Sequence, residues 1–293
     1  RGTKIDIKNF IKVMHQNGIY VVARMVIFKD PVLFKYENGK YAVFNRDTQG
    51  SWIGQYYSST HGMWVNIKER WLDPYCEFVW KYNIEIAKEL QEYGVDEIQF
   101  DYIRFPTDGM NLMSATYRYR REGQNYSDGL ESFLLYARNH LNVPISVDIY
   151  GSNGWYRMGD RIGQDVEMLS EHVDVISPML YPSHFPNNFL NFPPYEERPY
   201  RIYYYGTLRS LIMAEHKVEI RSWIQAFLLN SQPYDREYYN VDYVANSIIG
   251  CIDADRNAGF TLWHAGTQYP VLIPAFERTK NLVSGIRHAL NER

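Results

Sequence analysis

Apolar residues along the chain follow two patterns that alternate. Between residues 5 and 17 they recur every three to four positions, which predicts a helix that Gly18 can end. The next apolar run, 19–28, is continuous and rich in β-branched residues, which is typical of a strand covered on both faces. An irregular stretch over 34–70 follows, with a candidate hairpin turn at Asn38-Gly39. The chain therefore opens with a helix and a buried strand.

The order of helix and then strand recurs to the end of the chain. Asp73 and Pro74 are the residue types of an N-cap and a first helical position, so they predict the start of the second helix. Helices are expected at 74–93, 127–141 and 164–172, in a segment that ends near 216, at 239–257 and at 271–289. Strands are expected from 95 and over 143–150, 173–181, 218–227 and 259–265.

Strands that alternate with helices in this way predict an α/β fold with a parallel sheet covered by helices. The loops after strands are long, notably 30–72 and 106–126, as they are in a (β/α)8 TIM barrel. A doubly wound sheet is the alternative, but no G-x-G-x-x-G motif follows a strand. We therefore expect a single barrel domain over 1–293. We expect its first two β/α units to lie upstream of Arg1, so that a preceding segment or a partner chain completes the barrel.

Composition narrows the range of functions. The 293 residues carry a net charge of −3, so the chain lacks the basic excess of a nucleic-acid-binding protein, and no apolar run is long enough to span a membrane. Cys76 and Cys251 predict two unpaired thiols, not a zinc site. The chain is 16% aromatic, with 26 Tyr and 7 Trp. Such side chains suit a surface that stacks on sugar rings, and a large aromatic core explains them equally well.

Polar residues gather where the predicted strands end. In a barrel of parallel strands the carboxyl ends share one face, and the active site lies there. Polar groups in apolar strands are costly to bury unless they are paired, so their repetition at this face indicates a site. The candidates are Arg24, Lys29, Asp30, Asp101, Arg104, Asp148, Tyr150, Tyr181, His184, Gln225, Trp263 and His264.

Asp101 and Asp148 are the candidate catalytic pair. They end strands that are consecutive in the chain, so we expect their carboxyl groups to be about 5–9 Å apart. This range covers both kinds of glycosidase, in which one carboxylate attacks or stabilises the sugar and the other protonates the leaving oxygen. We assign Asp101 as nucleophile or base and Asp148 as general acid, with Arg104 separating their pKa values. The order of these two roles stays open.

Each candidate also has a structural interpretation. Asp101 could be a structural residue paired with Arg104, and Asp148 could be a buried, hydrogen-bonded residue of the strand. Lys29 and Asp30 could form a surface turn, and Trp263 with Tyr181 could fill a core. His184 and His264 belong to no HxH or HExxH motif, so we expect neither a metal nor a cofactor.

The motifs "YVVARMVIFKDP", "VDEIQFDYIRFPTDG", "ISVDIYG", "PMLYPSHF", "RSWIQAF" and "GFTLWHAG" resemble, in this order, those of a glycoside hydrolase domain family, the DUF4015 group. The resemblance covers nearly the whole chain. It implies a TIM barrel whose catalytic residues are Asp101 and Asp148. It also implies a carbohydrate substrate, a polysaccharide or cell-envelope glycan, and a place in the cell envelope or outside the cytoplasm. The family's last strand usually ends in Trp-Asn, whereas this chain has Trp263-His264.

The resemblance further implies a set of substrate-binding positions. The residues that match the family's polar strand-end pattern are Arg24, Lys29, Asp30, Arg104, Gln164, Asp165, Tyr181, His184 and Gln225. Asp165 stands at a predicted helix start, so an N-cap is the alternative for it. A glycan-binding or scaffolding barrel without catalysis is the alternative for the whole chain.

Overall fold

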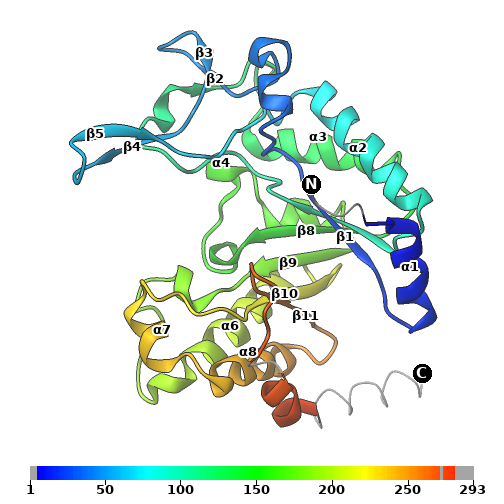
Figure 1. Ribbon diagram of the computed structural model, residues 1–293, viewed down its shortest axis with the longest axis vertical. Helices are drawn as coiled ribbons and strands as arrows, with labels where there is room; N and C mark the ends of the chain where they lie inside the picture. The colour runs from blue at the N-terminus through cyan, green and yellow to red at the C-terminus, as the bar shows by residue number, and fades with distance from the viewer. Residues whose placement is uncertain (1–4, 271–272, 281–293) are drawn as a thin grey trace. The chain divides into compact units, whose positions relative to one another are not determined.

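The computed structural model describes residues 5–270 and 273–280, in which parallel strands alternate with helices (Figure 1). The chain forms two compact units. The first is made of residues up to 147 together with 158–173, and the second is made of 148–157 and the chain from 174 onward. The predicted alternation of helix and strand is confirmed in both units.

The first unit has three parallel strands. They are β1 (Val22–Val26), β6 (Glu97–Asp101) and β8 (Ile145–Tyr150), hydrogen-bonded in that order, and the first half of β8 belongs to this unit. Its helices are α1 (Ile7–Gln16), α2 (Glu77–Glu92), α3 (Tyr126–Arg138), α4 (Gly159–Ile162) and α5 (Val166–Ser170). Phe28 and Phe100 pack edge-on against Phe133 of α3, with ring centroids 5.5 and 5.1 Å apart. These aromatic contacts hold α3 against β6 and the segment after β1.

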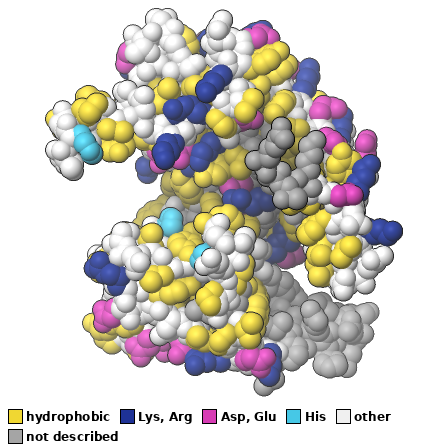
Figure 2. Space-filling view, viewed as in Figure 1, with side chains coloured by type: hydrophobic (Ala, Val, Ile, Leu, Met, Phe, Trp, Pro, Cys, Tyr) yellow, Lys and Arg dark blue, Asp and Glu magenta, His cyan; other side chains and the backbone are white. Residues whose placement is uncertain are grey.

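Short elements fill the long loops of the first unit. They are the 3₁₀ segments η1 (Leu33–Gly39) and η2 (Leu112–Ser114), and the strands β2 (Phe44–Asn45), β3 (Gly50–Ser51), β4 (Gln55–Ser58), β5 (Met63–Asn66) and β7 (Ala115–Thr116). β4 and β5 pair as an antiparallel hairpin whose Tyr57 and Trp64 are about half exposed. No charged residue occurs over 48–67, and the projecting hairpin shows only yellow, white and cyan side chains (Figure 2).

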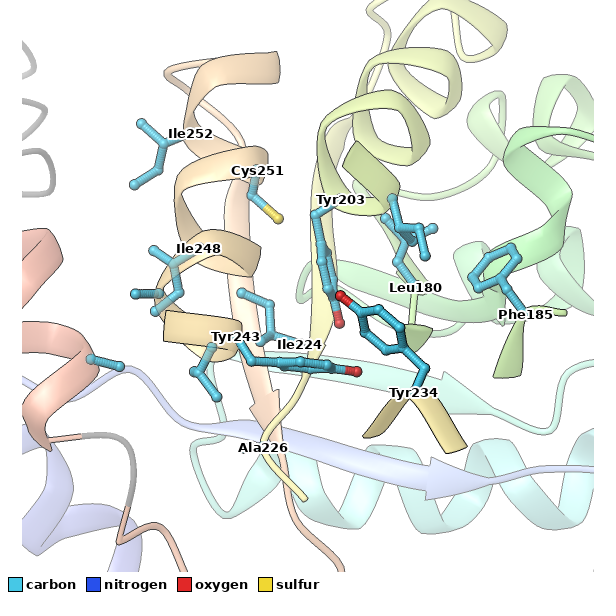
Figure 3. Close-up of a cluster of buried hydrophobic side chains, with 14 residues drawn as sticks. Leu180, Phe185, Tyr203, Ile224, Ala226, Tyr234, Tyr243, Ile248, Cys251 and Ile252 are labelled. Atoms are coloured by element: carbon cyan, nitrogen blue, oxygen red, sulfur yellow. The ribbon is translucent and has the colours of Figure 1, made fainter. Parts of the chain in front are cut away.

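The second unit has its own three strands, β9 (Val175–Met179), β10 (Glu219–Gln225) and β11 (Gly259–Trp263), parallel and in that order. Its helical segments are η3 (Gly151–Gly154), η4 (Pro182–His184), η5 (Tyr195–Glu197), α6 (Arg198–Met213), α7 (Pro233–Tyr238) and α8 (Val241–Ala254). Tyr203, Ile224 and Ile248, from α6, β10 and α8, are among the buried residues of one core cluster (Figure 3). This core holds the two long helices against the strands.

The structure corrects two local predictions. Asn38-Gly39 forms no hairpin, because Glu37 and Asn38 both have left-handed backbone angles, which turn the chain inside η1. The hairpin lies further on, in β4 and β5. The second helix does not begin at Pro74, because Asp73 instead closes a turn in which its carboxylate accepts the N–H groups of Tyr75 and Tyr119. That helix, α2, begins at Glu77.

Three further predictions concern the cysteines, the last helix and membrane spans. Cys76 and Cys251 are both buried free thiols. Residues 273–280 are helical, whereas the rest of the helix expected at 271–289 lies outside the described residues. Within the described part of the chain, no helix combines the length and the apolar character that a membrane span requires.

The core of the second unit predicts a contrast between two isoleucines. Ile248→Ala removes a fully buried side chain from α8, so we expect it to lower the free energy of unfolding by about 2–5 kcal/mol. Ile212→Ala removes an exposed side chain from α6, and we expect a change within about 0.5 kcal/mol. Urea unfolding followed by circular dichroism measures both. Equal losses would contradict the assignment of Ile248 to the core.

Candidate active site

Asp101 ends a strand whose polar side chains all lie on one face. Along β6, Glu97, Gln99 and Asp101 alternate with apolar residues, and every residue of the strand is buried. Because successive side chains of a strand point to opposite faces, these three share a face. Ser146 of the neighbouring β8 donates a hydrogen bond to Glu97. The period-two pattern in "EIQFD" could have indicated Glu97 and Gln99, which the sequence analysis missed.

The direct partner of Asp101 is Arg24. In the parallel pairing of β1 with β6, Val26 lies opposite Asp101, and Arg24 lies two residues before Val26. The guanidinium of Arg24 donates to Oδ2 of Asp101 and forms an ion pair with it. The N–H of Tyr102 donates to Oδ1 at 2.6 Å. The carboxylate is thus held on both oxygens.

Burial and the bonds to Asp101 have opposite effects on the pKa of its carboxyl group. Asp101 is only 3% exposed, and its burial raises its pKa above the ordinary value of a carboxyl group. The Arg24 charge and the Tyr102 N–H oppose that rise. A carboxylate with a raised pKa takes up a proton at a higher pH than an exposed aspartate, which suits a general base.

Two further cations lie beside Asp101 and meet at the ring of Tyr102. Lys29 Nζ is 4.2 Å from the ring centroid, and the guanidinium carbon of Arg104 is 5.4 Å from it. Arg104 also lies over the ring of Trp71 at 4.7 Å and donates to the carbonyl oxygen of Phe105 at 3.0 Å. The charge of Arg104 lowers the pKa of Asp101, as expected, but its effect is smaller than that of Arg24. Trp71 and Tyr102 were not among the residues selected from the sequence.

Three other candidates in the first unit make hydrogen bonds to backbone groups. Asp30 Oδ1 accepts the N–H groups of the residues two and three positions later, at 2.6 and 3.0 Å, and so starts η1. Gln164, which is buried, donates to the carbonyl oxygen of Ile103 at 3.1 Å. Asp165 is the N-cap of α5 and accepts the N–H of Met168 at 3.0 Å, as its alternative interpretation predicted. These bonds position loops around the strand ends.

In the second unit, Asp148 is held by a tryptophan. The carboxylate is 1% exposed, and its Oδ1 accepts the indole N–H of Trp223 at 2.6 Å. Trp263 meets the ring of Trp223 edge-on, with centroids 5.7 Å apart. Gly151, just past the end of β8, makes a close approach to β9, because an added Cβ would lie 2.3 Å from the carbonyl oxygen of Met179. The candidate acid thus stands on a tightly packed strand end.

Tyr181 and His184 form a second group in this unit, together with Phe227. Their rings pack edge-on, with centroids 5.3 Å apart for Tyr181 and His184 and 5.5 Å apart for Tyr181 and Phe227. Burial lowers the pKa of His184, which favours its neutral form. A neutral imidazole beside aromatic faces can hydrogen-bond a sugar hydroxyl without carrying a charge.

Gln225 is fully engaged inside the protein. Its amide nitrogen donates to Phe227 O at 2.9 Å and to Asp235 Oδ2 at 2.6 Å. Its amide oxygen accepts the N–H of Ser183 at 3.1 Å. Gln225 therefore connects the loops after β9 and β10, and Asp235, which the sequence analysis did not select, is its main partner.

The remaining candidates are Tyr150 and His264. Tyr150 ends β8 and is partly buried. His264 Nδ1 accepts the N–H of Gly266 at 3.0 Å, which closes a turn after β11. Among residues 5–270 and 273–280, no group of three or more His, Cys, Asp or Glu side chains is arranged to hold a metal ion.

The Arg24–Asp101 pair predicts a pH-dependent loss of stability. In Arg24→Gln the buried carboxylate loses its opposite charge, so we expect the free energy of unfolding to fall by about 3 kcal/mol at pH 8. The folded-state pKa of Asp101 then lies further above its unfolded value, so the loss grows as the pH rises and shrinks below pH 5. Arg46→Gln removes an exposed pair and is the control. A loss independent of pH would contradict this assignment.

The Asp148–Trp223 bond predicts coupling between two substitutions. Trp223→Phe keeps a ring but removes the indole N–H, and Asp148→Ala removes the acceptor. A hydrogen bond to a charged group contributes about 1.5–3 kcal/mol. We therefore expect the double variant to lose less free energy of unfolding than the two single variants lose together, by about that amount. Urea unfolding of the four proteins measures the difference. Additive losses would show that the bond contributes nothing.

Comparisons with solved structures give the fold class. The chain is similar to the spore cortex-lytic enzyme SleL of Bacillus cereus, with 11% identity over 94% of this chain and 63% of that one, and a TM-score of 0.50. It is also similar to the PgaB (BpsB) glycoside hydrolase domain of Bordetella bronchiseptica, with 10% identity over 87% and 73%, and a TM-score of 0.52. These likenesses and the parallel strands confirm the predicted class, an α/β fold of the TIM-barrel type represented by six strands.

A third structure shares more of the sequence. A hypothetical protein from Ruminiclostridium thermocellum is 38% identical over 50% of this chain and 67% of that chain, with a TM-score of 0.40. No curated protein matches the chain. The family described as "Putative glycosyl hydrolase domain", DUF4015, matches residues 1–269. The match covers far more than half of the sequence, so the chain belongs to this family of glycosyl hydrolase domains.

Proposed function

We propose that this protein is a glycoside hydrolase that cleaves a polysaccharide or cell-envelope glycan, with Asp101 and Asp148 as its catalytic carboxylates. The main support for the proposal is that the two residues lie toward the carboxyl ends of the adjacent parallel strands β6 and β8, in a chain of this family. Phe100 and Val147 are partners in the parallel pairing of β6 with β8, and each carboxylate follows directly after one of them. Such strand ends are where barrel enzymes place their chemistry.

The two carboxylates have different surroundings, as the two roles require. Asp101 contacts a guanidinium and lies near two further cations, whereas Asp148 accepts an indole N–H. The Arg24 charge favours the ionised form of Asp101 against the effect of burial, and an ionised carboxylate suits a nucleophile or a stabilising base. The general acid that protonates the leaving oxygen does not need such a charge beside it, so the remaining role falls to Asp148. This division supports the assignment of Asp101 as nucleophile or base and Asp148 as acid.

The aromatic groups near the strand ends support a carbohydrate substrate. Tyr102 lies beside the first carboxylate and Trp263 lies beside the partner of the second, and both rings are partly exposed. Their flat apolar faces match the C–H faces of pyranose rings. SleL is described as a spore cortex-lytic enzyme, and by this parallel we propose a place in the cell envelope or outside the cytoplasm.

A glycan-binding barrel without catalysis is the second candidate. Both carboxylates are almost fully buried and engaged in bonds within the protein, which is also what structural aspartates show. In that case aromatic side chains would bind the glycan, and neither aspartate would affect hydrolysis.

Substitution of each aspartate distinguishes the two functions. We expect Asp101→Asn and Asp148→Asn each to lower kcat by about a hundredfold to ten-thousandfold, because each removes an acid, base or nucleophile but keeps the side-chain shape. The release of reducing ends from purified cell-envelope polysaccharides measures kcat. Asp47→Asn, at an exposed position, is the control and should keep full activity. If the wild type binds glycan but releases no reducing ends, the protein is a glycan-binding barrel and the proposed hydrolase activity is wrong.

A further inference from the structure

A small pocket in the second unit lies outside the candidate residues. It has a volume of about 250 Å³ and is open to solvent. One wall comes from the loop after β9 and the other from α7, which follows β10. The lining residues are Asn187, Asn191, Tyr195, Pro233, Tyr234, Glu237 and Tyr238. Both walls therefore follow the strand ends that carry Tyr181 and Gln225.

The first wall is held rigidly by two buried arginines of α6. Arg198, 1% exposed, donates to the carbonyl oxygens of Phe189 at 2.9 Å and of Pro186 at 3.0 Å. Arg201 donates to those of Phe192 at 2.6 Å and of Pro194 at 3.0 Å. These bonds fix the backbone of the loop from 182 to 194, so the wall exists before any ligand arrives.

The second wall is fixed by Asp235, which is fully buried in α7. Its carboxylate accepts the Gln225 amide at 2.6 Å and the Tyr243 hydroxyl at 3.1 Å. The hydroxyl of Tyr234 donates to the carbonyl oxygen of Tyr195 at 2.7 Å and so joins the two walls. The pocket is therefore a built feature of the fold.

The chemistry of the lining favours an uncharged sugar. Tyr234 and Tyr238 are stacked, with ring centroids 4.7 Å apart, and Tyr195 is 44% exposed. Asn187, Asn191 and Glu237 supply amide and carboxylate groups beside these rings. No Lys or Arg is among the lining residues, so the pocket lacks the cation that would recognise a phosphate, sulfate or uronic acid. Flat rings with hydrogen-bonding groups at their edges match a neutral pyranose.

We propose that this pocket is a subsite that binds one neutral pyranose ring of a glycan, away from the bond that is cleaved. The proposal rests on the function proposed above, since it gives the glycan substrate a further place of contact within the second unit. Tyr238 supplies the stacking ring. Asn187 and Glu237 hydrogen-bond the sugar hydroxyls. A long glycan would then contact both the strand ends of the second unit and this pocket, and a short one would reach only those strand ends.

Binding measurements on the full chain test the subsite. The probes are hexamers of glucose, of N-acetylglucosamine and of galacturonic acid, titrated calorimetrically into Asp101→Asn so that hydrolysis does not interfere. We expect at least one neutral hexamer to bind, and Tyr238→Ala to weaken that binding about tenfold, whereas Tyr238→Trp keeps it. We expect the galacturonate hexamer not to bind at this pocket. Tyr205→Ala, which removes an exposed tyrosine of α6, is the matched control and should leave the affinity unchanged.

The outcomes separate this proposal from the proposed function. If no neutral hexamer binds, or if Tyr238→Ala binds as tightly as its parent, the subsite is wrong. An equal loss in Tyr205→Ala also overturns it. Hydrolysis is measured independently in the otherwise wild-type chain, where Tyr238→Ala should raise KM for polysaccharide and leave kcat unchanged. If reducing ends never appear but Tyr238→Ala still weakens binding, the glycosidase proposal fails and the subsite stands.

Discussion

A carboxylate at the end of a buried strand must find a charged or hydrogen-bonding partner, and this requirement organises the strand ends of both units. Asp101 accepts hydrogen bonds from the guanidinium of Arg24 and the N–H of Tyr102, and Asp148 accepts one from the indole N–H of Trp223. Without such partners the cost of desolvating either group would exceed what the surrounding apolar contacts supply. The bonds that offset the desolvation cost of these carboxylates also hold them in fixed positions.

Buried polar groups give the loops of the second unit the rigidity that a binding surface needs. Arg198 and Arg201 satisfy carbonyl groups that a long loop would otherwise leave unpaired, and Asp235 ties α7 to the end of β10. Each of these residues is polar and almost fully buried, yet each is paired. Loops after strands can therefore be long and still have a fixed backbone, which the proposed subsite requires.

Much of the fold was predictable, because apolar periodicity and Gly stops act locally, and the same patterns located the strand ends at which the candidate residues were selected. The partners of the carboxylates were not predictable. Sequence spacing pointed to Arg104 as the partner of Asp101, but the register of β1 against β6 brings Arg24 closer. Trp223 and Asp235 were missed for the same reason, since contacts over long sequence distances leave no periodic signal. Asp165 shows the reverse case, because an N-cap is a local property and was foreseen as its alternative role.

The uncharged hairpin of β4 and β5 has a consequence for how this protein meets proteases. An exposed two-stranded hairpin is normally an easy target for cleavage. Here a protease that cuts after Lys or Arg has no site between Arg46 and Lys68, because neither residue occurs in that interval. Tryptic digestion therefore spares this exposed aromatic segment by sequence alone, whereas an enzyme that cuts after aromatic residues finds Tyr57 and Trp64 about half exposed.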